Sequence, residues 1–257
     1  MFLITHHVLK EIYSHKIRIM NIALIGYGRM GHEIETIAIS RGHKITLVID
    51  KDNLSDLNHQ NTREIDVAIE FTTPETAFEN LCKCFSLKIP VVCGTTGWMK
   101  DYEKAVDICR ENGVSFIHSS NFSIGVNILF RLNSMLAGFV SKYHEYKPFI
   151  EEIHHTRKLD APSGTAITLA NGIVAENPSF KGWCFEQDRL PGMIPVSAVR
   201  EGLVPGTHKI EWDSPVDRIT IRHEAKNRRG LALGAVVAAE YIHSRTGIYT
   251  MDDVLGF

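Results

Sequence analysis

The most reactive group of side chains lies in residues 152–166, where the sequence reads EIHHTRKLDAPSGTA. An imidazole such as that of His154 titrates near neutral pH and can give a proton to a substrate that gains negative charge. The ammonium group of Lys158 is a fixed positive charge for that substrate or for a carboxylate. A proline then leads into Ser-Gly-Thr, where a hydroxyl can cap a helix whose first N–H groups bind anions. The segment predicts a site for a small acid with more than one carboxylate.

Two other interpretations of this segment stay open from the residues alone. In an extended chain the side chains of His154 and His155 point to opposite faces, so the pair does not easily share one metal ion. No nearby carboxylate or cysteine completes a recognisable ligand set, and we expect no bound metal. A solvated basic loop is the second alternative.

A glycine-rich turn near the start of the chain predicts a dinucleotide site. Between an apolar run at 20–26 and a stretch of helical periodicity, the chain reads Gly26-Tyr27-Gly28-Arg29-Met30-Gly31. The first glycine permits a tight turn, the second lets the backbone approach a pyrophosphate, and the third lets the helix pack on the strand. A glycine-rich turn without a cofactor is the alternative.

Two adjacent residues bear on the choice of cofactor. Asp50 ends the second predicted strand, 19 residues after Gly31. An acid there can accept hydrogen bonds from the ribose 2′-hydroxyl of NADH. Lys51 follows and can pair with the 2′-phosphate of NADPH. We therefore expect NADH, NADPH or both.

Small polar residues also follow the later predicted strands. In open α/β sheets, ligands bind outside the carboxyl ends of the strands. These turns can therefore line a nicotinamide pocket, although ordinary turn chemistry is the alternative. The residues concerned are Gly94, Thr95 and Thr96 after the fourth strand, and Ser119, Ser120, Asn121 and Phe122 after the fifth.

Alternating strands and helices position these turns. The pattern is typical of the α/β class, as a Rossmann-type doubly wound parallel sheet. Helical segments separate the apolar strand segments, which we expect at 20–26, 44–50, 65–72, 89–97 and 114–119.

The pattern changes after about residue 125, and consecutive strands predict a second α+β domain with a mixed or antiparallel sheet. A nearly all-apolar helix at 230–244 is expected to be buried against the first domain. The other expected elements are helices at 127–140 and 163–176 and strands at 149–155, 196–202, 207–213 and 218–224.

The composition excludes several classes of protein. Hydrophobic residues make up 44% and charged residues 23%, which is ordinary for a globular protein and argues against disorder. A formal net charge of −2 gives no general attraction for nucleic acid. No apolar run approaches the roughly 20 residues that span a bilayer. An odd count of five cysteines without a CxxC pair fits reduced thiols, so we expect a cytoplasmic protein without membrane partners.

Together these motifs resemble the dihydrodipicolinate reductase family, now called 4-hydroxy-tetrahydrodipicolinate reductase. The segment 152–166 is the specific feature of the resemblance. Supporting matches run in family order from residue 20 to residue 257 and include GYGRMG (26–31), EFTTPE (70–75), CGTTGW (93–98), NFSIGVN (121–127), LALGAVVAA (231–239) and DDVLGF (252–257).

The resemblance implies that NADH or NADPH delivers hydride to a cyclic imine-type dicarboxylate, with loss of water, in lysine and diaminopimelate synthesis. His154 stands at the family's proton-donor position and Lys158 at its second catalytic position. His155, Gly164 and Thr165 stand where the family binds substrate carboxylates. The glycine turn, Asp50 and the turns after the fourth and fifth strands stand where it binds the cofactor.

The resemblance also implies a domain division and a homotetramer. Residues 20–125 and 229–257 would form the dinucleotide-binding domain, and residues 126–228 the substrate-binding and oligomerisation domain. Residues 1–19 would be an N-terminal extension. Another Rossmann oxidoreductase acting on a small dicarboxylate, or a non-enzymatic NAD(P)-sensing protein, are the alternatives.

Overall fold

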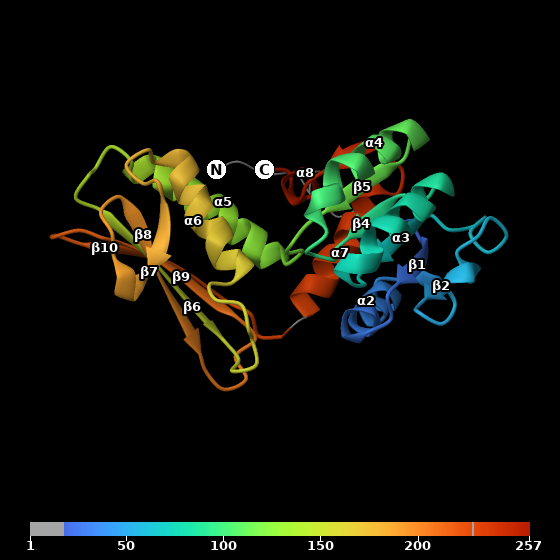
Figure 1. Cartoon of the computed structure of the whole chain (residues 1–257), viewed down its shortest axis with the longest axis horizontal. Helices are drawn as coiled ribbons and strands as arrows, with labels where there is room; N and C mark the ends of the chain where they lie inside the picture. Colours follow the sequence, from blue (N-terminus) through green and yellow to red (C-terminus); the bar gives the residue numbers. More distant parts are fainter. Residues whose placement is uncertain (1–17, 228) are drawn as a thin grey trace, which may run out of the picture.

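The computed structural model describes residues 18–227 and 229–257, which form two sheets with helices packed against them (Figure 1). The predicted N-terminal extension lies outside the described residues except for its last two. None of the helices in the described part of the chain combines the length and the apolar run that crossing a bilayer requires. Short 3-10 helices connect some of the elements: η1 (Leu54–Asp56), η2 (Met99–Asp101) and η3 (Glu186–Asp188).

The first sheet has six parallel strands in the order β11-β5-β4-β3-β1-β2, which confirms the predicted doubly wound sheet. The strand order reverses at β1, because β2 lies on one side of it and the later strands lie on the other. Ligands bind beside such a reversal in sheets of this kind. The strands are β1 (Asn21–Ile25), β2 (Lys44–Ile49), β3 (Val67–Glu70), β4 (Val91–Cys93), β5 (Ser115–His118) and β11 (Gly247–Tyr249).

Helices cover both faces of the first sheet. Helices α2 (Arg29–Ser40) and α7 (Arg229–Ile242) share one core with the strands, whereas α3 (Pro74–Ser86) and α4 (Tyr102–Asn112) form a second core on the opposite face. Helix α7 is the apolar helix predicted at the C-terminus, and it is buried against this sheet as expected. Helix α7 also lies close to the turn after β5, because a Cβ added to Gly234 would lie 1.6 Å from the Phe122 carbonyl oxygen.

The second sheet is mixed, with the strand order β10-β9-β6-β8-β7. Its central strand β6 pairs with β8 in parallel and with β9 antiparallel, which confirms the predicted mixed sheet. Two helices pack on one face and form the third core with it. The elements are β6 (Lys147–His154), β7 (Gly182–Phe185), β8 (Met193–Arg200), β9 (Thr207–Asp213), β10 (Arg218–Glu224), α5 (Ile124–Val140) and α6 (Gly164–Glu176).

Several boundaries differ from the expected ones for local reasons. Helix α5 begins three residues earlier than expected because the Ser123 hydroxyl accepts a hydrogen bond from the Val126 N–H and caps it. The 3-10 turn η2 leads directly into α4. The short strands β7 and β11, with four and three residues, and helix α8 (Met251–Leu255) were not predicted.

Candidate active site

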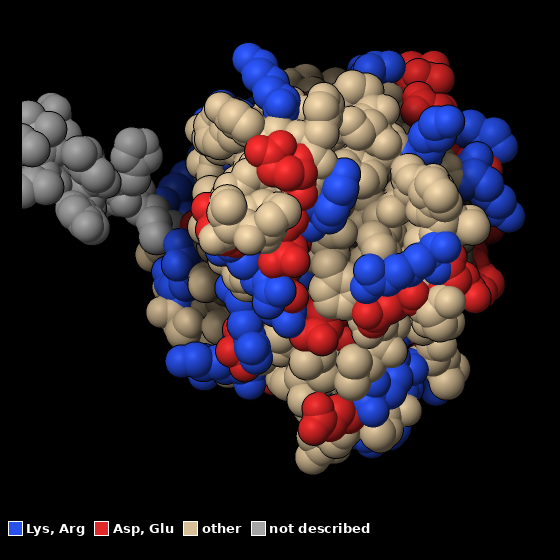
Figure 2. All heavy atoms as spheres, turned by 90° about the vertical axis from the view of Figure 1, so that its left-hand side faces the viewer, with Lys and Arg blue, Asp and Glu red and all other residues tan. Residues whose placement is uncertain are grey.

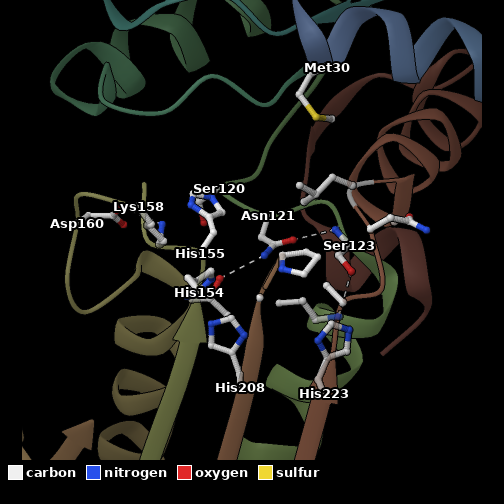
Figure 3. Close-up of a pocket in the computed structure, with 18 of the residues that line it drawn as sticks. Met30, Ser120, Asn121, Ser123, His154, His155, Lys158, Asp160, His208 and His223 are labelled. Carbon is white, nitrogen blue, oxygen red and sulfur yellow. Dashed lines mark hydrogen bonds and ion pairs between the residues drawn. The ribbon is translucent and has the colours of Figure 1, made fainter. Parts of the chain in front are cut away.

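A hollow of about 600 Å³ lies where the turns of the first sheet meet the second sheet (Figure 3). Met30, Ser120 and Asn121 line it from the side of the first sheet. From the side of the second sheet it is lined by His154, His155, Lys158, Thr165, His208 and His223. The structure therefore brings the two predicted catalytic residues, two of the three predicted substrate residues and part of the predicted cofactor residues to one cavity, whereas Gly164 does not line it.

Two smaller hollows continue from it along the carboxyl edge of the first sheet. One of about 390 Å³ shares Met30 with the large hollow and is also lined by Arg29, Gly94, Thr95 and Thr96. The other, of about 480 Å³, shares Gly28 and Thr72 with the hollow of about 390 Å³. It is also lined by Gly26, Tyr27, Asp50 and Lys51. The three hollows form a row in which an extended ligand can lie.

The glycine turn has the geometry that a dinucleotide requires. Gly26 has a φ of +92°, and a Cβ there would lie 2.1 Å from the Phe71 carbonyl oxygen. A Cβ on Gly31 would lie 2.5 Å from the Gly26 carbonyl oxygen. At Gly28, the N-cap of α2, a Cβ would meet nothing within 4 Å. The first and third glycines thus serve packing, while the second leaves the helix N-terminus open to a pyrophosphate.

A buried carboxylate joins two of the turns that face these hollows. Glu70, fully buried at the end of β3, accepts hydrogen bonds from the N–H (3.1 Å) and the hydroxyl of Thr72. Its other oxygen accepts from the Cys93 thiol at 2.9 Å. Burial and the neighbouring carboxylate raise the pKa of Cys93, which keeps the thiol protonated. Because the Thr95 hydroxyl accepts from the Thr72 N–H (2.8 Å), this network fixes the ends of β3 and β4 together.

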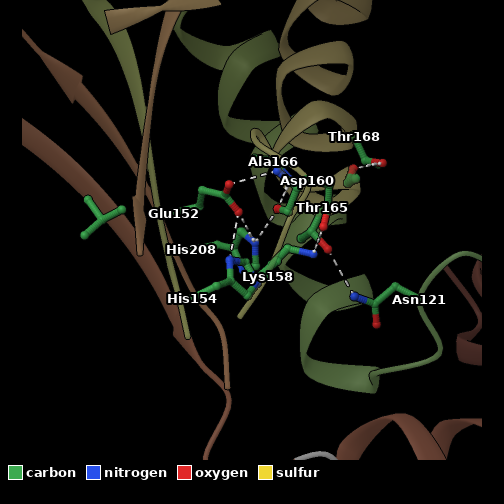
Figure 4. Close-up of polar contacts among 12 residues, drawn as sticks. Asn121, Glu152, His154, Lys158, Asp160, Thr165, Ala166, Thr168 and His208 are labelled. Atoms are coloured by element: carbon green, nitrogen blue, oxygen red, sulfur yellow. Dashed lines mark hydrogen bonds and ion pairs between the residues drawn. The ribbon is translucent and has the colours of Figure 1, made fainter. Parts of the chain in front are cut away.

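A second buried carboxylate lies beside His154. Glu152 and His154 are two residues apart on β6 and share its buried face. His154 Nδ1 lies 2.9 Å from Glu152 Oε2 (Figure 4). Glu152 Oε1 accepts from Arg200 Nη2 at 3.0 Å. Oε1 also accepts from the Ser163 N–H at 2.8 Å. Burial raises the pKa of Glu152, but the contacts with His154, Ser163 and Arg200 outweigh it and lower the pKa to about 2.

His208 completes this cluster from the neighbouring strand β9. Its Nε2 lies 3.9 Å from Glu152 Oε2 and 3.3 Å from the Ser163 hydroxyl. Burial, with the nearby His154, lowers the pKa of His208 to about 4 despite the Glu152 carboxylate. The His208 ring is therefore neutral at pH 7.

The first turn of α6 presents the predicted carboxylate site. The Ser163 hydroxyl accepts from the Ala166 N–H at 3.2 Å and is the cap, so Thr165 is not. A Cβ on Gly164 would meet nothing within 4 Å, which leaves room for a ligand at the first N–H groups. The Thr165 hydroxyl accepts from Asn121 Nδ2 at 3.2 Å, which connects this turn to the first sheet.

Lys158 lines the large hollow, and its Nζ lies 2.8 Å from Asp160 Oδ1. Burial raises the pKa of Asp160, but the contact with Lys158 outweighs it and lowers the pKa. The neighbouring His155 also lines the hollow, and its backbone N–H donates to the Val204 carbonyl at 2.8 Å. The Lys158 and His155 side chains are thus carried by a loop that a backbone hydrogen bond to Val204 fixes in place.

Three of the predicted cofactor residues, Gly31, Ser119 and Phe122, do not line these hollows. The Phe122 ring is 1% exposed and packs in the core of the first sheet. The Ser119 hydroxyl donates to the Asn121 carbonyl (2.9 Å) and accepts from the Asn121 N–H (3.2 Å). Ser119 and Phe122 shape the turn that presents Ser120 and Asn121.

The sequence reasoning assigned no role to five residues of the site: Glu70, Glu152, Arg200, His208 and His223. Glu152 carries the one local signal that was available, because a residue two positions from His154 shares its face of a strand. The others are brought into place by strand pairing. It sets His208 opposite Glu152, Arg200 opposite His154, His223 opposite His208 and Glu70 opposite Cys93.

Comparisons with known proteins give one consistent result. Family models described as dihydrodipicolinate reductase, N-terminus and C-terminus, match residues 20–122 and 125–255. The 4-hydroxy-tetrahydrodipicolinate reductase of Christiangramia forsetii is 54% identical over 92% of this chain and 98% of its own length. That of Bdellovibrio bacteriovorus is 38% identical over 92% and 96%. The dipicolinate-bound dihydrodipicolinate reductase of Paenisporosarcina sp. TG-14 shares the fold, with a TM-score of 0.75 at 24% identity over 90% of this chain and 97% of that one.

Proposed function

The chain belongs to the dihydrodipicolinate reductase family, and on this basis we propose that it reduces 4-hydroxy-tetrahydrodipicolinate to tetrahydrodipicolinate with NADH or NADPH, in lysine and diaminopimelate biosynthesis. The substrate gains one hydride and one proton and loses one water. One observation carries the proposal. His154, Lys158 and Thr165 line the same hollow as Met30 and Ser120, which follow strands of the dinucleotide-type sheet.

NADH or NADPH supplies the hydride when it is bound. The glycine turn and the Thr95-Thr96 turn would hold its pyrophosphate and nicotinamide, because they line the adjoining hollows. Asp50 and Lys51 both line the hollow of about 480 Å³. An acid that suits a 2′-hydroxyl and a cation that suits a 2′-phosphate are both available, so we propose that the enzyme accepts either cofactor.

His154 would donate the proton that neutralises the charge left on the conjugated ring after hydride transfer. Lys158 would supply a fixed positive charge to the same developing anion and to a carboxylate. One substrate carboxylate would take the place of Asp160 at Lys158 Nζ. His155 and the first N–H groups of α6, at Gly164 and Thr165, would bind the carboxylates.

We propose that no metal takes part. One group in the described ranges has the spacing of metal ligands, namely Glu152, His154 and His208, whose ligand atoms lie within 4.8 Å of one another. The Arg200 guanidinium already binds this carboxylate at 3.0 Å and balances its charge. Full activity after dialysis against a chelator would agree with this assignment, and activity restored only by added Zn²⁺ would contradict it.

The proposed domain division follows the packing of the two sheets. Residues 20–125 and 229–257 would form the dinucleotide-binding domain, since α7 packs on the first sheet and β11 pairs with β5. Residues 126–228 would form the substrate-binding and oligomerisation domain. Helix α5 packs with α6 on the second sheet and belongs to that domain from its third residue, Val126.

A homotetramer is the proposed assembly. Helix α5 leaves one apolar stripe exposed, at positions 128, 132, 135 and 139, and Phe139 is 68% exposed. Apolar surface of this kind is typical of contacts between subunits. Sedimentation equilibrium measures the assembly, and Phe139→Asp should yield smaller species.

We propose a cytoplasmic location with no nucleic-acid partner. All five cysteines are free thiols, as in proteins of reducing compartments. Figure 2 shows the end of the molecule that carries the second sheet, where basic side chains lie among acidic ones rather than in one patch. Ion pairs such as Lys209–Glu151 at 3.1 Å account for part of this mixture.

The test is a coupled assay. The substrate is generated in place from pyruvate and aspartate semialdehyde by a synthase, and oxidation of NADH or NADPH is followed in separate reactions. Oxidation that requires the synthase supports the reductase. Folded protein that binds a cofactor but oxidises none would overturn it in favour of an NAD(P)-sensing protein. His154→Ala sharpens the distinction, because a reductase loses turnover while it still binds cofactor.

A further inference from the structure

We propose that Glu152 is a positioning residue that orients His154 for proton transfer and ties it to the carboxylate-binding turn of α6. The inference rests on the proposed function, because it takes His154 as the proton donor. Glu152 is fully buried in the central strand of the second sheet and lines none of the three hollows described above. It therefore acts through its neighbours rather than on the substrate.

The first half of the geometry is the contact with the imidazole. His154 Nδ1 lies 2.9 Å from Glu152 Oε2, and a carboxylate at this distance favours the neutral form of the ring that carries its proton on Nδ1. The other nitrogen, Nε2, is then the one that gains and loses the transferred proton. A Cβ added to Gly206, in the wall of the hollow, would lie 3.1 Å from Nε2, so a glycine there keeps this nitrogen uncrowded.

The second half of the geometry is the pair of hydrogen bonds to the other oxygen of the Glu152 carboxylate. Oε1 accepts from Arg200 Nη2 at 3.0 Å and from the Ser163 N–H at 2.8 Å. Two donors on Oε1 prevent the carboxylate from rotating and keep Oε2 directed at His154. Arg200 also donates to the Asp160 carbonyl, so it connects this carboxylate to the loop that carries Lys158. One buried group thus contacts the proton donor and the start of α6, and Arg200 connects it to the loop of the second cation.

The charges around His154 make Glu152 the group that can stabilise an imidazolium. From the other elements, His208 of β9, Arg200 of β8 and Lys158 of the loop face the same cluster, with Asp160 paired to that lysine. His208 is neutral at pH 7, and Arg200 and Lys158 are cations that disfavour a second positive charge. The Glu152 carboxylate offsets them at 2.9 Å. Without the charge of Glu152, the cations nearby would leave a charged His154 ring less stable.

The kinetic test compares Glu152→Gln, Glu152→Asp and a matched control in the coupled assay. Glutamine keeps an oxygen for Ser163 and Arg200 but removes the charge beside His154. We expect kcat to fall by about 10- to 100-fold, less than the 10²–10⁴-fold of a lost general acid. KM for the substrate should stay within about threefold, since the turn of α6 keeps its contact. The alkaline limb of the kcat profile should move to lower pH, and Glu152→Asp should restore part of that shift.

The control is Glu151→Gln. Glu151 is the preceding residue on the same strand, points to the opposite face and pairs with Lys209 at 3.1 Å. Its variant should keep the wild-type kcat and pH profile. A Glu152→Gln enzyme with reduced kcat but an unshifted alkaline limb would overturn the inference, because a merely structural role predicts that result.

A readout without turnover separates this inference from the proposed function. In ¹⁵N-histidine-labelled protein, the His154 signal is assigned by its loss in His154→Gln. We expect the Nδ1-protonated tautomer in the wild type and loss of this preference in Glu152→Gln, or in Glu152→Asp if the glutamine variant does not fold. An unchanged tautomer overturns the inference. Wild-type protein without turnover, or an active His154→Gln enzyme, would instead overturn the proposed function or its assignment of the proton donor.

Discussion

Asn121 Nδ2 donates a hydrogen bond to Thr165 Oγ1 over 3.2 Å, and this contact joins the carboxyl edge of the first sheet to the first turn of α6. Asn121 is itself held on several sides, because its Oδ1 accepts from the Ser123 N–H and its carbonyl accepts from Ser119 and Asn127. The first turn of α6 is therefore fixed relative to the carboxyl edge of the first sheet by a residue that lines the hollow between them.

Asn121→Ala should raise KM for the substrate by about fivefold, which corresponds to one neutral hydrogen bond of about 1 kcal/mol. The KM for the cofactor should change little, because the glycine turn is untouched. Steady-state kinetics with both substrates varied measures the two values. Asn61→Ala, an exposed residue in the loop after β2, is the control. An unchanged KM for the substrate would contradict a role for this contact in binding.

Lys158→Gln should lower both binding and turnover, because in the proposed mechanism the same ammonium group binds a carboxylate and stabilises the charge that develops on the ring. We expect kcat/KM to fall by at least about 100-fold, with contributions from both parameters. Lys209→Gln removes a lysine of the same sheet that is paired with Glu151 and Glu211, and it should retain activity. If Lys158→Gln changed KM alone, the residue would bind the substrate without assisting the reaction.

The fold and the residues that the structure gathers at the candidate site could be predicted because their signals are local. The glycine turn follows an all-apolar strand, β1, and the segment containing His154, Lys158 and the start of α6 is continuous in the sequence. A helix cap, a tight turn and a strand end are each set by residues within a few positions. Local sequence patterns were therefore enough to predict the glycine turn and the segment that contains His154 and Lys158.

The cluster around Glu152 could not be predicted because it depends on strand register. His208 faces Glu152 only because β9 pairs antiparallel with β6 in one register, and Arg200 faces His154 only through the parallel pairing with β8. A shift of one residue would turn those side chains to the other face, and a single sequence does not fix the register. The strands β7 and β11 were missed because three or four residues carry no clear periodicity.

The pKa of His208 predicts a pH dependence of stability. Its value in the folded protein, about 4, lies below the value of about 6.5 in an unfolded chain, because burial and the nearby His154 disfavour the charged ring. As the pH falls below about 6.5, the unfolded chain therefore binds a proton that the folded protein does not. The free energy of unfolding should drop by up to about 2 kcal/mol between about pH 6.5 and about pH 5 from this group.

Urea unfolding of the wild type and of His208→Asn across this range measures the effect. The variant should show a flatter dependence on pH, whatever its absolute stability. His59→Asn, which changes an exposed histidine, should keep the wild-type slope. Parallel curves for the wild type and His208→Asn would show that the buried ring does not titrate as described.

Two glycines of the same turn should separate cofactor binding from folding. Alanine at position 28 adds a Cβ that meets no atom of the chain within 4 Å, at a backbone φ of −77° that alanine readily adopts. That Cβ would instead enter the hollows in which the pyrophosphate is proposed to bind, so Kd for NADH and NADPH should rise by at least about tenfold with Tm nearly unchanged. Alanine at position 31 places its Cβ 2.5 Å from the Gly26 carbonyl oxygen. The free energy of unfolding should therefore fall by about 1–3 kcal/mol.

Fluorescence titration and thermal unfolding of Gly28→Ala and Gly31→Ala test both statements at once. Each variant is the control for the other, because the two differ only in whether the added methyl group meets protein or open space. Unaltered cofactor affinity in Gly28→Ala would mean that the pyrophosphate does not approach this backbone. The row of hollows would then hold a different ligand, since the open face of Gly28 is the feature that makes the turn accessible.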